Sequence, residues 1–137
     1  MEGSVSVELS VIRFDQRMQN FKKCVNLLSR QSQRPGFGEE NVAATLHFFE
    51  MTSELAWKLL KDYLSVEGIE INSPRAVIKE SFSMGVILQG ALWLEMLDAR
   101  NNIAHTYEDQ LARAIVVAVR ERYANELRSL EELRCSA

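Results

Sequence analysis

Apolar side chains recur every three or four residues along most of the chain, which is the spacing of amphipathic helices. This helical spacing begins at Phe14 and continues to Leu28. Before Phe14, apolar and polar residues alternate as in a short strand, at Val5, Val7, Leu9 and Val11. We expect the first residues to be loose and a first helix to start near residues 8–10. The proline and glycines of residues 33–38 break any helix, so the first helix should end before Gln33.

The second helix is predicted over residues 39–67, with Gly68 as its stop signal. Its predicted buried face consists of Val42, Leu46, Phe49, Ser53, Ala56, Trp57, Leu60 and Leu64. Ser73 followed by Pro74 is typical of a helix start, because serine caps the N-terminus and proline fits the first turn. The third helix that they begin is short and closes at Gly85.

A fourth helix is expected from Leu88 or Gly90 to about Asn102. Thr106, with Asp109 three residues later, resembles a capping box and predicts the start of the last helix. The predicted buried face of that helix consists of Leu111, Ile115, Val119, Tyr123, Leu127 and Leu130.

The fold class follows from these segments, because long amphipathic helices joined by short loops pack antiparallel to one another. We predict an all-α, antiparallel up-and-down bundle of about four to five helices. A length of 137 residues is that of one ordinary domain, so residues 1–137 are expected to form a single helical domain. The formal net charge of −3 argues against a broad basic surface for nucleic acid, although it leaves room for a small local site.

The two cysteines, Cys24 and Cys135, are read as reduced thiols of a cytoplasmic protein, with a disulfide as the less favoured alternative. The sequence has no Cys/His cluster with metal-ligand spacing, so neither a metal nor another cofactor is expected. The longest apolar run, 114–119, is far too short to span a bilayer. Residues 1–4 lack the features of a signal peptide, and no membrane association is expected.

Candidate chemistry is concentrated at the predicted end of the fourth helix. Arg100 carries a permanent positive charge, and His105 titrates near neutral pH. His105 is suited to take the proton of a ribose 2′-hydroxyl or to protonate a leaving 5′-oxygen, while Arg100 holds the phosphate. The amide of Asn101 is placed to fix the phosphate or to orient the imidazole. This route to phosphodiester cleavage needs no metal ion.

Helix geometry sets a condition on this site. Five residues of an ideal helix turn the side chains of Arg100 and His105 about 140° apart. The pair therefore needs either a helix break near residues 102–104 or a two-fold dimer that brings two copies of the motif to one cleft.

Each candidate also has a purely structural interpretation. Arg100 would then pair with a surface carboxylate, namely Glu95, Asp98 or Glu108, and His105 would bond to a carbonyl. Tyr107 is either an exposed acceptor for group transfer or a ring packed over the helix junction. Glu54 and Lys58 have the spacing of an ordinary helical ion pair. Three aromatic side chains are assigned structural roles, with His47 partly buried and Trp57 and Trp93 in the core.

The residues of this segment resemble a known family. Arg100 to His105 fits the R-x4-H signature of HEPN domains, and the stretch through Tyr107 fits the R-x4-H-x-Y form of HEPN toxins. Residues 49–64, 73–75 and 93–96 are similar to segments of the nucleotidyltransferase substrate-binding branch of this family. The resemblance extends over about residues 40–110.

The resemblance implies a HEPN bundle that forms a homodimer, with Arg100 and His105 lining a cleft between protomers. It implies a metal-independent endoribonuclease toxin with RNA as substrate, in which Asn101 matches the polar position after the arginine. A partner minimal nucleotidyltransferase (MNT) would silence the toxin by adenylylating Tyr107. The alternative is a non-catalytic subunit that presents a substrate to a nucleotidyltransferase or regulates it, so enzymatic activity itself stays open.

Overall fold

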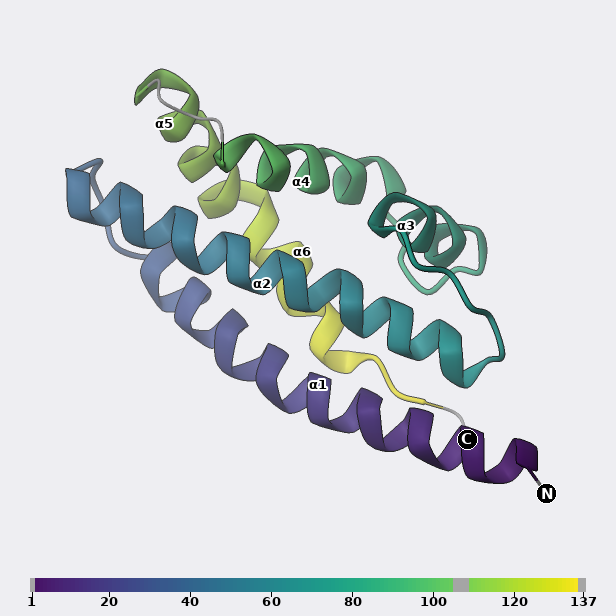
Figure 1. The fold of residues 1–137 in the computed structure, drawn as a ribbon. Helices are drawn as coiled ribbons and strands as arrows, with labels where there is room; N and C mark the ends of the chain where they lie inside the picture. The colour runs from purple at the N-terminus through teal and green to yellow at the C-terminus, as the bar shows by residue number, and fades with distance from the viewer. Residues whose placement is uncertain (1, 105–108, 136–137) are drawn as a thin grey trace.

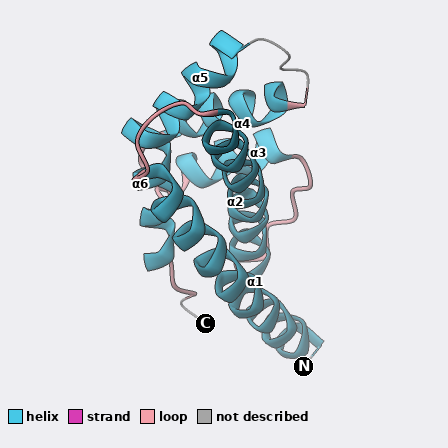
Figure 2. Cartoon of the chain, turned by 90° about the vertical axis from the view of Figure 1, so that its left-hand side faces the viewer, coloured by secondary structure: helices cyan, strands magenta, loops and turns pink. Residues whose placement is uncertain are grey.

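The computed structural model describes residues 2–104 and 109–135, with side chains from residue 7 onward in these ranges. All regular structure within them is helical, which confirms the all-α prediction (Figures 1 and 2). In chain order, the helices are α1 (Glu2–Ser32), α2 (Glu39–Val66), α3 (Pro74–Ser83), α4 (Gly90–Ile103), α5 (Asp109–Ala118) and α6 (Ala124–Ser129). A π-helical turn (Val119–Tyr123) joins α5 to α6, and a 3-10 turn (Leu130–Glu132) follows α6.

Helix α2 lies at the centre of the bundle. It runs antiparallel to α1, and the two helices lie side by side over most of their length (Figure 1). α2 also contacts α3, α4, α5 and α6, so every other helix packs against it. The continuous rod formed by α5, the π turn and α6 crosses behind α2 and leads the chain back toward α1 (Figure 1). The described chain is thus an up-and-down bundle, as predicted.

The core forms where the apolar stripes of these helices meet. Large side chains with almost no exposure come from α1, α2, α3, the π turn and the C-terminal rod: Phe21, Val25, Leu28, Phe49, Leu59, Leu60, Leu64, Val77, Val119 and Leu127. Burial of one such side chain stabilises the fold by about 1.5–3 kcal/mol relative to its exposed state. The three- and four-residue spacing in the sequence predicted all of these side chains except Leu59 and Val77.

The predicted start of the first helix was wrong. α1 begins at Glu2 rather than near residues 8–10, and the alternating residues lie within the helix. Val7, Leu9 and Ile12 are exposed, because the first turns of α1 extend beyond the other helices (Figure 2). Adding turns to an existing helix costs little, since only its nucleation is unfavourable.

The π turn in the C-terminal rod was not predicted, but the sequence pattern explains it. Ile115, Val119, Tyr123 and Leu127 follow one another at intervals of four residues, and all four are buried. An α-helix has 3.6 residues per turn, so a strict four-residue repeat drifts around the helix. A wider π turn compensates for this drift and keeps Val119 and Tyr123 on the buried face. Only Leu111, also assigned to this face, is exposed.

The structure also tests the roles that the sequence assigned to three aromatic side chains and to the two cysteines. Trp93 is buried and Trp57 packs partly buried against the core, whereas His47 is exposed and not partly buried as predicted. Cys24 and Cys135 are both free thiols. Within the described residues, no helix combines the length and apolar character needed to cross a membrane.

Candidate functional site

The predicted site residues fall into two groups. Arg100 and Asn101 lie in the last turn of α4, which ends at Ile103, with Ala104 as its C-cap. His105 and Tyr107, as well as Thr106 of the predicted capping box, lie outside the described residues. The helix thus ends between the arginine and the histidine, as the sequence required for the two side chains to share a site.

Helix α4 is anchored so that Arg100 faces α2. Trp93 and Met96 are buried, and Arg100 follows Met96 by four residues on the same side of the helix. The indole Nε1 of Trp93 donates a hydrogen bond to Glu126 Oε2 at 3.0 Å, which ties α4 to α6. These contacts direct the guanidinium toward the middle of α2.

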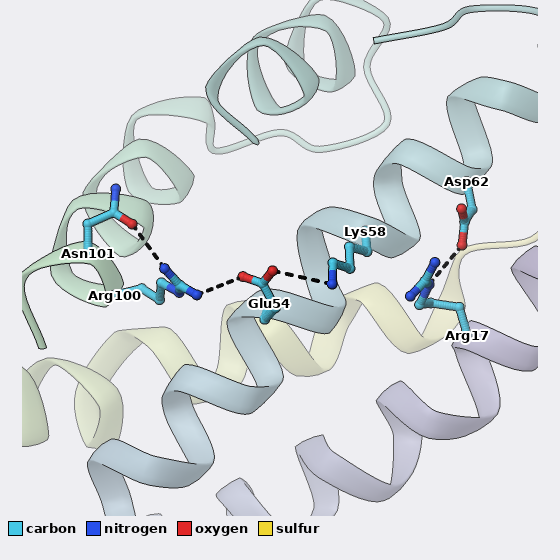
Figure 3. A network of polar contacts seen from close by, with 6 residues as sticks. All are labelled: Arg17, Glu54, Lys58, Asp62, Arg100 and Asn101. Carbon is cyan, nitrogen blue, oxygen red and sulfur yellow. Dashed lines mark hydrogen bonds and ion pairs between the residues drawn. The ribbon is translucent and has the colours of Figure 1, made fainter. Parts of the chain in front are cut away.

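On α2, the guanidinium meets a carboxylate. Arg100 Nη2 lies 3.0 Å from Glu54 Oε2, and Arg100 Nη1 donates a long hydrogen bond of 3.4 Å to Asn101 Oδ1 (Figure 3). The Arg100 and Glu54 side chains are 32% and 33% exposed, so both are open to a ligand from solvent. Among the described residues, only Glu54 and Asn101 contact the two Nη atoms, which carry four N–H groups, so further N–H groups remain to bind an anion.

The inner edge of Arg100 adjoins a small cavity between α2, α3, α4 and α6. The cavity has a volume of about 20 Å³ and is lined by Arg100, Ser53 and six apolar side chains, among them Trp57 and Trp93. Arg100 Nε and Ser53 Oγ are buried, and no described residue provides a hydrogen-bond partner for either atom. A cavity of this size has room for a single water molecule, and Arg100 Nε and Ser53 Oγ are two polar atoms that it could bind. Arg100 therefore has a buried inner edge and a solvent-facing outer edge.

The surface partners considered for Arg100 in the sequence were wrong where the structure describes them. Glu95 pairs with Arg122 at 2.7 Å, and Asp98 pairs with Arg75 at 2.7 Å. Glu108 lies outside the described residues. These carboxylates lie on α4 itself or next to it in sequence, whereas the actual partner comes from α2.

Glu54 is the site residue that the sequence did not assign. Its predicted ion pair with Lys58 is confirmed, with Lys58 Nζ 3.4 Å from Glu54 Oε1 (Figure 3). The pair with Arg100 spans 46 positions of sequence, and a helical spacing rule detects only neighbours on the same helix. The sequence held one signal for this contact. The carboxylate of Glu54 lies next to Ser53, a residue of the predicted buried face of α2.

The described part of the site can bind a phosphate but has no histidine to act as its general base. Arg100 offers a planar cation suited to bidentate contact with a phosphodiester. Within the described ranges, no three histidine, cysteine or acidic side chains are grouped so that they would hold a metal ion. A proton acceptor would have to come from His105, five residues further along the chain.

Comparison with known proteins identifies the family. The sequence profile described as "Nucleotidyltransferase substrate binding protein like" matches residues 16–134. The chain belongs to this family. The matched range includes every helix that builds the site and the whole R-x4-H-x-Y segment. This result confirms the family resemblance noted in the sequence.

Two individual proteins are similar to this member of the family. One is a "Probable ribonuclease HepT" of Haemophilus influenzae, 26% identical over 98 residues that cover 68% of this chain and 67% of the relative. The other is a protein of Thermus thermophilus known from a crystal structure, with a TM-score of 0.73 and 29% identity. The match covers 82% of this chain and 99% of the other. The similarity to the Thermus thermophilus structure supports the helical bundle described above.

Proposed function

We propose that this family member is a HEPN-type endoribonuclease toxin in which Arg100, Asn101 and His105 form the active site. The proposal rests on the placement of Arg100, a partly exposed guanidinium fixed at the end of α4 just before the histidine. The similarity to a probable ribonuclease supports RNA as the substrate. The R-x4-H segment supplies both the phosphate-binding cation and the proton acceptor.

The proposed reaction is metal-independent. His105 accepts the proton of the ribose 2′-hydroxyl, and the 2′-oxygen attacks the adjacent phosphorus atom. The bond from phosphorus to the 5′-oxygen breaks, and the protonated His105 gives its proton to the leaving 5′-oxygen. The products are a 2′,3′-cyclic phosphate and a 5′-hydroxyl end. Arg100 stabilises the negative charge that builds up on the phosphoryl oxygens, and Asn101 helps to hold the phosphate or to orient the imidazole.

The proposal also includes a dimer of this chain and a partner protein that controls its activity. Two copies of the chain would form a dimer that lines one cleft with both R-x4-H motifs, in a protein that acts in the cytoplasm. A minimal nucleotidyltransferase would attach adenylate to Tyr107, two residues beyond His105. Each added phosphate places negative charge beside Arg100 and blocks RNA from the cleft. The family description, which links the chain to nucleotidyltransferases, supports this partner.

The second candidate function is a non-catalytic subunit that presents a substrate to a nucleotidyltransferase or regulates it. The family description favours it, since it names substrate binding and not cleavage. In this case Arg100 would bind the phosphate of a substrate on which the partner acts.

Growth of cells that produce the chain without its partner separates the two functions. We expect the wild-type chain to arrest growth, and we expect Arg100→Ala to abolish the arrest because the phosphate is no longer held. Arg75→Ala is the matched control, since Arg75 is another exposed arginine paired with a carboxylate, and it should still arrest growth. Co-expression with a minimal nucleotidyltransferase should restore growth and add the mass of adenylate to the wild type but not to Tyr107→Phe. Unimpaired growth with the wild-type chain alone would favour the non-catalytic subunit.

A further inference from the structure

One carboxylate is shared by two cations at the edge of the candidate site. Glu54 Oε2 lies 3.0 Å from Arg100 Nη2, and Glu54 Oε1 lies 3.4 Å from Lys58 Nζ. Figure 3 shows the two cations approaching this carboxylate from opposite sides, Arg100 from α4 and Lys58 from the next turn of α2. Each carboxylate oxygen of Glu54 thus contacts one cation, and this single carboxylate holds the two cations near each other.

The charges in this group do not cancel. Two cations share one anion, so the group carries one net positive charge at neutral pH on a chain whose overall charge is −3. The side chains of Lys58 and Glu54 are 38% and 33% exposed, so solvent screens both pairs. Exposed ion pairs of this kind contribute little to stability, and an incoming anion can replace the carboxylate.

A second ion pair in the same view provides a contrast. Arg17 on α1 donates to Asp62 on α2 at 2.9 Å, and the Asp62 side chain is only 6% exposed (Figure 3). That pair joins two packed helices and has one cation for one anion, and its carboxylate is buried although the Arg17 side chain is 28% exposed. The group around Glu54 differs in exposure and in its excess of positive charge, which are the properties of a binding site for an anion.

We propose that Lys58 binds the phosphate next to the one held by Arg100, and that Glu54 is the internal counter-ion with which RNA competes. The inference rests on the proposed function, because it takes Arg100 as the residue that holds the scissile phosphate. It adds a second contact along the strand and directs the RNA backbone from α4 over the middle of α2. Glu54 keeps both cations in place while RNA is absent and weakens RNA binding by its negative charge.

Binding of an uncleavable RNA tests this proposal without requiring catalysis. The probe is a short RNA with 2′-O-methyl groups in place of the 2′-hydroxyls, titrated against Lys58→Met, Glu54→Gln and the wild type. We expect Lys58→Met to weaken binding about 3- to 10-fold and to reduce the slope of log K against log salt by about 0.7, the effect of one lost phosphate contact. Glu54→Gln should tighten binding by a similar factor, about 3- to 10-fold, because it removes a competing negative charge.

Lys23→Met is the matched control, since Lys23 is an exposed lysine on α1, and its binding should equal that of the wild type. Circular dichroism of each variant confirms that the fold is intact. Binding by Lys58→Met that is no weaker than by Lys23→Met overturns the proposal. So does weaker binding by Glu54→Gln, which would make Glu54 a residue that positions Arg100 for RNA. Failure of the wild type to bind the probe also overturns it.

Cleavage of ordinary RNA by the same preparations distinguishes this inference from the proposed function. If the wild type does not cleave RNA but the expected order of binding holds, the phosphate site stands and the ribonuclease assignment fails. If cleavage occurs but the order of binding is absent, the ribonuclease assignment stands and the role of Lys58 fails.

Discussion

The hydroxyl of Tyr123 donates a hydrogen bond of 2.6 Å to Glu95 Oε2 from the edge of the core, and its ring stacks on Phe49. Arg122 pairs with the same carboxylate oxygen at 2.7 Å. Burial and the hydrogen bond to Glu95 raise the pKa of Tyr123 well above its ordinary value. The hydrogen bonds from Arg122 and then Tyr123 lower the pKa of Glu95. These residues join α4 to the π turn.

The raised pKa of Tyr123 has a testable consequence for stability at high pH. The unfolded chain releases the phenolic proton near pH 10, whereas the folded chain retains it at higher pH. The unfolded state therefore binds fewer protons above about pH 10, and the free energy of unfolding falls as the pH rises. We expect urea denaturation to show a smaller fall for Tyr123→Phe than for the wild type. Equal pH dependence for the two proteins would contradict this assignment.

At the scale of single residues, the sequence predicted the parts of the site that lie on one element. The ion pair of Glu54 with Lys58 follows from spacing along one helix, and Arg100 was singled out by its charge and by the R-x4-H motif. The contact between Glu54 and Arg100 depends on how α2 and α4 pack, which no local pattern encodes. Burial of His47 was wrongly predicted for the same reason, because neighbouring apolar residues do not show which side of α2 is covered.

At the scale of elements, Ser73 shows how a local signal sets a helix boundary. Its side chain accepts a hydrogen bond from the backbone N–H of Ala76 at 3.1 Å, and Pro74 occupies the first position of α3. Both features were predicted from the dipeptide alone. We expect Ser73→Ala to lower the free energy of unfolding by about 1 kcal/mol, since an amide of the first turn loses its partner.

Chemical denaturation measures this loss, and Ser83→Ala is its control. Ser83 is an exposed serine in the last turn of the same helix, so its replacement should leave stability nearly unchanged. Equal stability of the Ser73 and Ser83 variants would show that the cap does not stabilise α3.

The errors in the predicted helix boundaries have physical causes at this scale. The end of α2, both ends of α3 and the start of α4 were placed within a few residues, because glycine, serine and proline mark them. The start of α1 was misplaced because alternating apolar residues suit a strand only if a partner strand exists. The π turn was missed because its cause, a four-residue repeat, becomes visible only when the packed face is known.

At the scale of the whole molecule, the bundle presents the end of α4 beside the middle of α2. This arrangement places Arg100, Glu54 and Lys58 on one surface, although they come from distant parts of the chain (Figure 3). The proposed dimer would complete this surface with a second copy of the motif. Amphipathic spacing predicted that helices pack, but it carries no information about which turns of two helices meet. The family resemblance supplied the proposed function, and the structure supplied the neighbours of Arg100.

The central claim is that Arg100 and His105 cleave RNA, and one cleavage assay tests it most directly. The protein, shown by intact mass to carry no group on Tyr107, is incubated with RNA in the presence of a chelator. We expect cleavage by the wild type and by His47→Ala, which replaces the exposed histidine of α2. Cleavage by His105→Ala should be slower by a factor of about 10² or more, the usual contribution of a general base. Equal rates for the wild type and His105→Ala, or no cleavage by either, would contradict the claim.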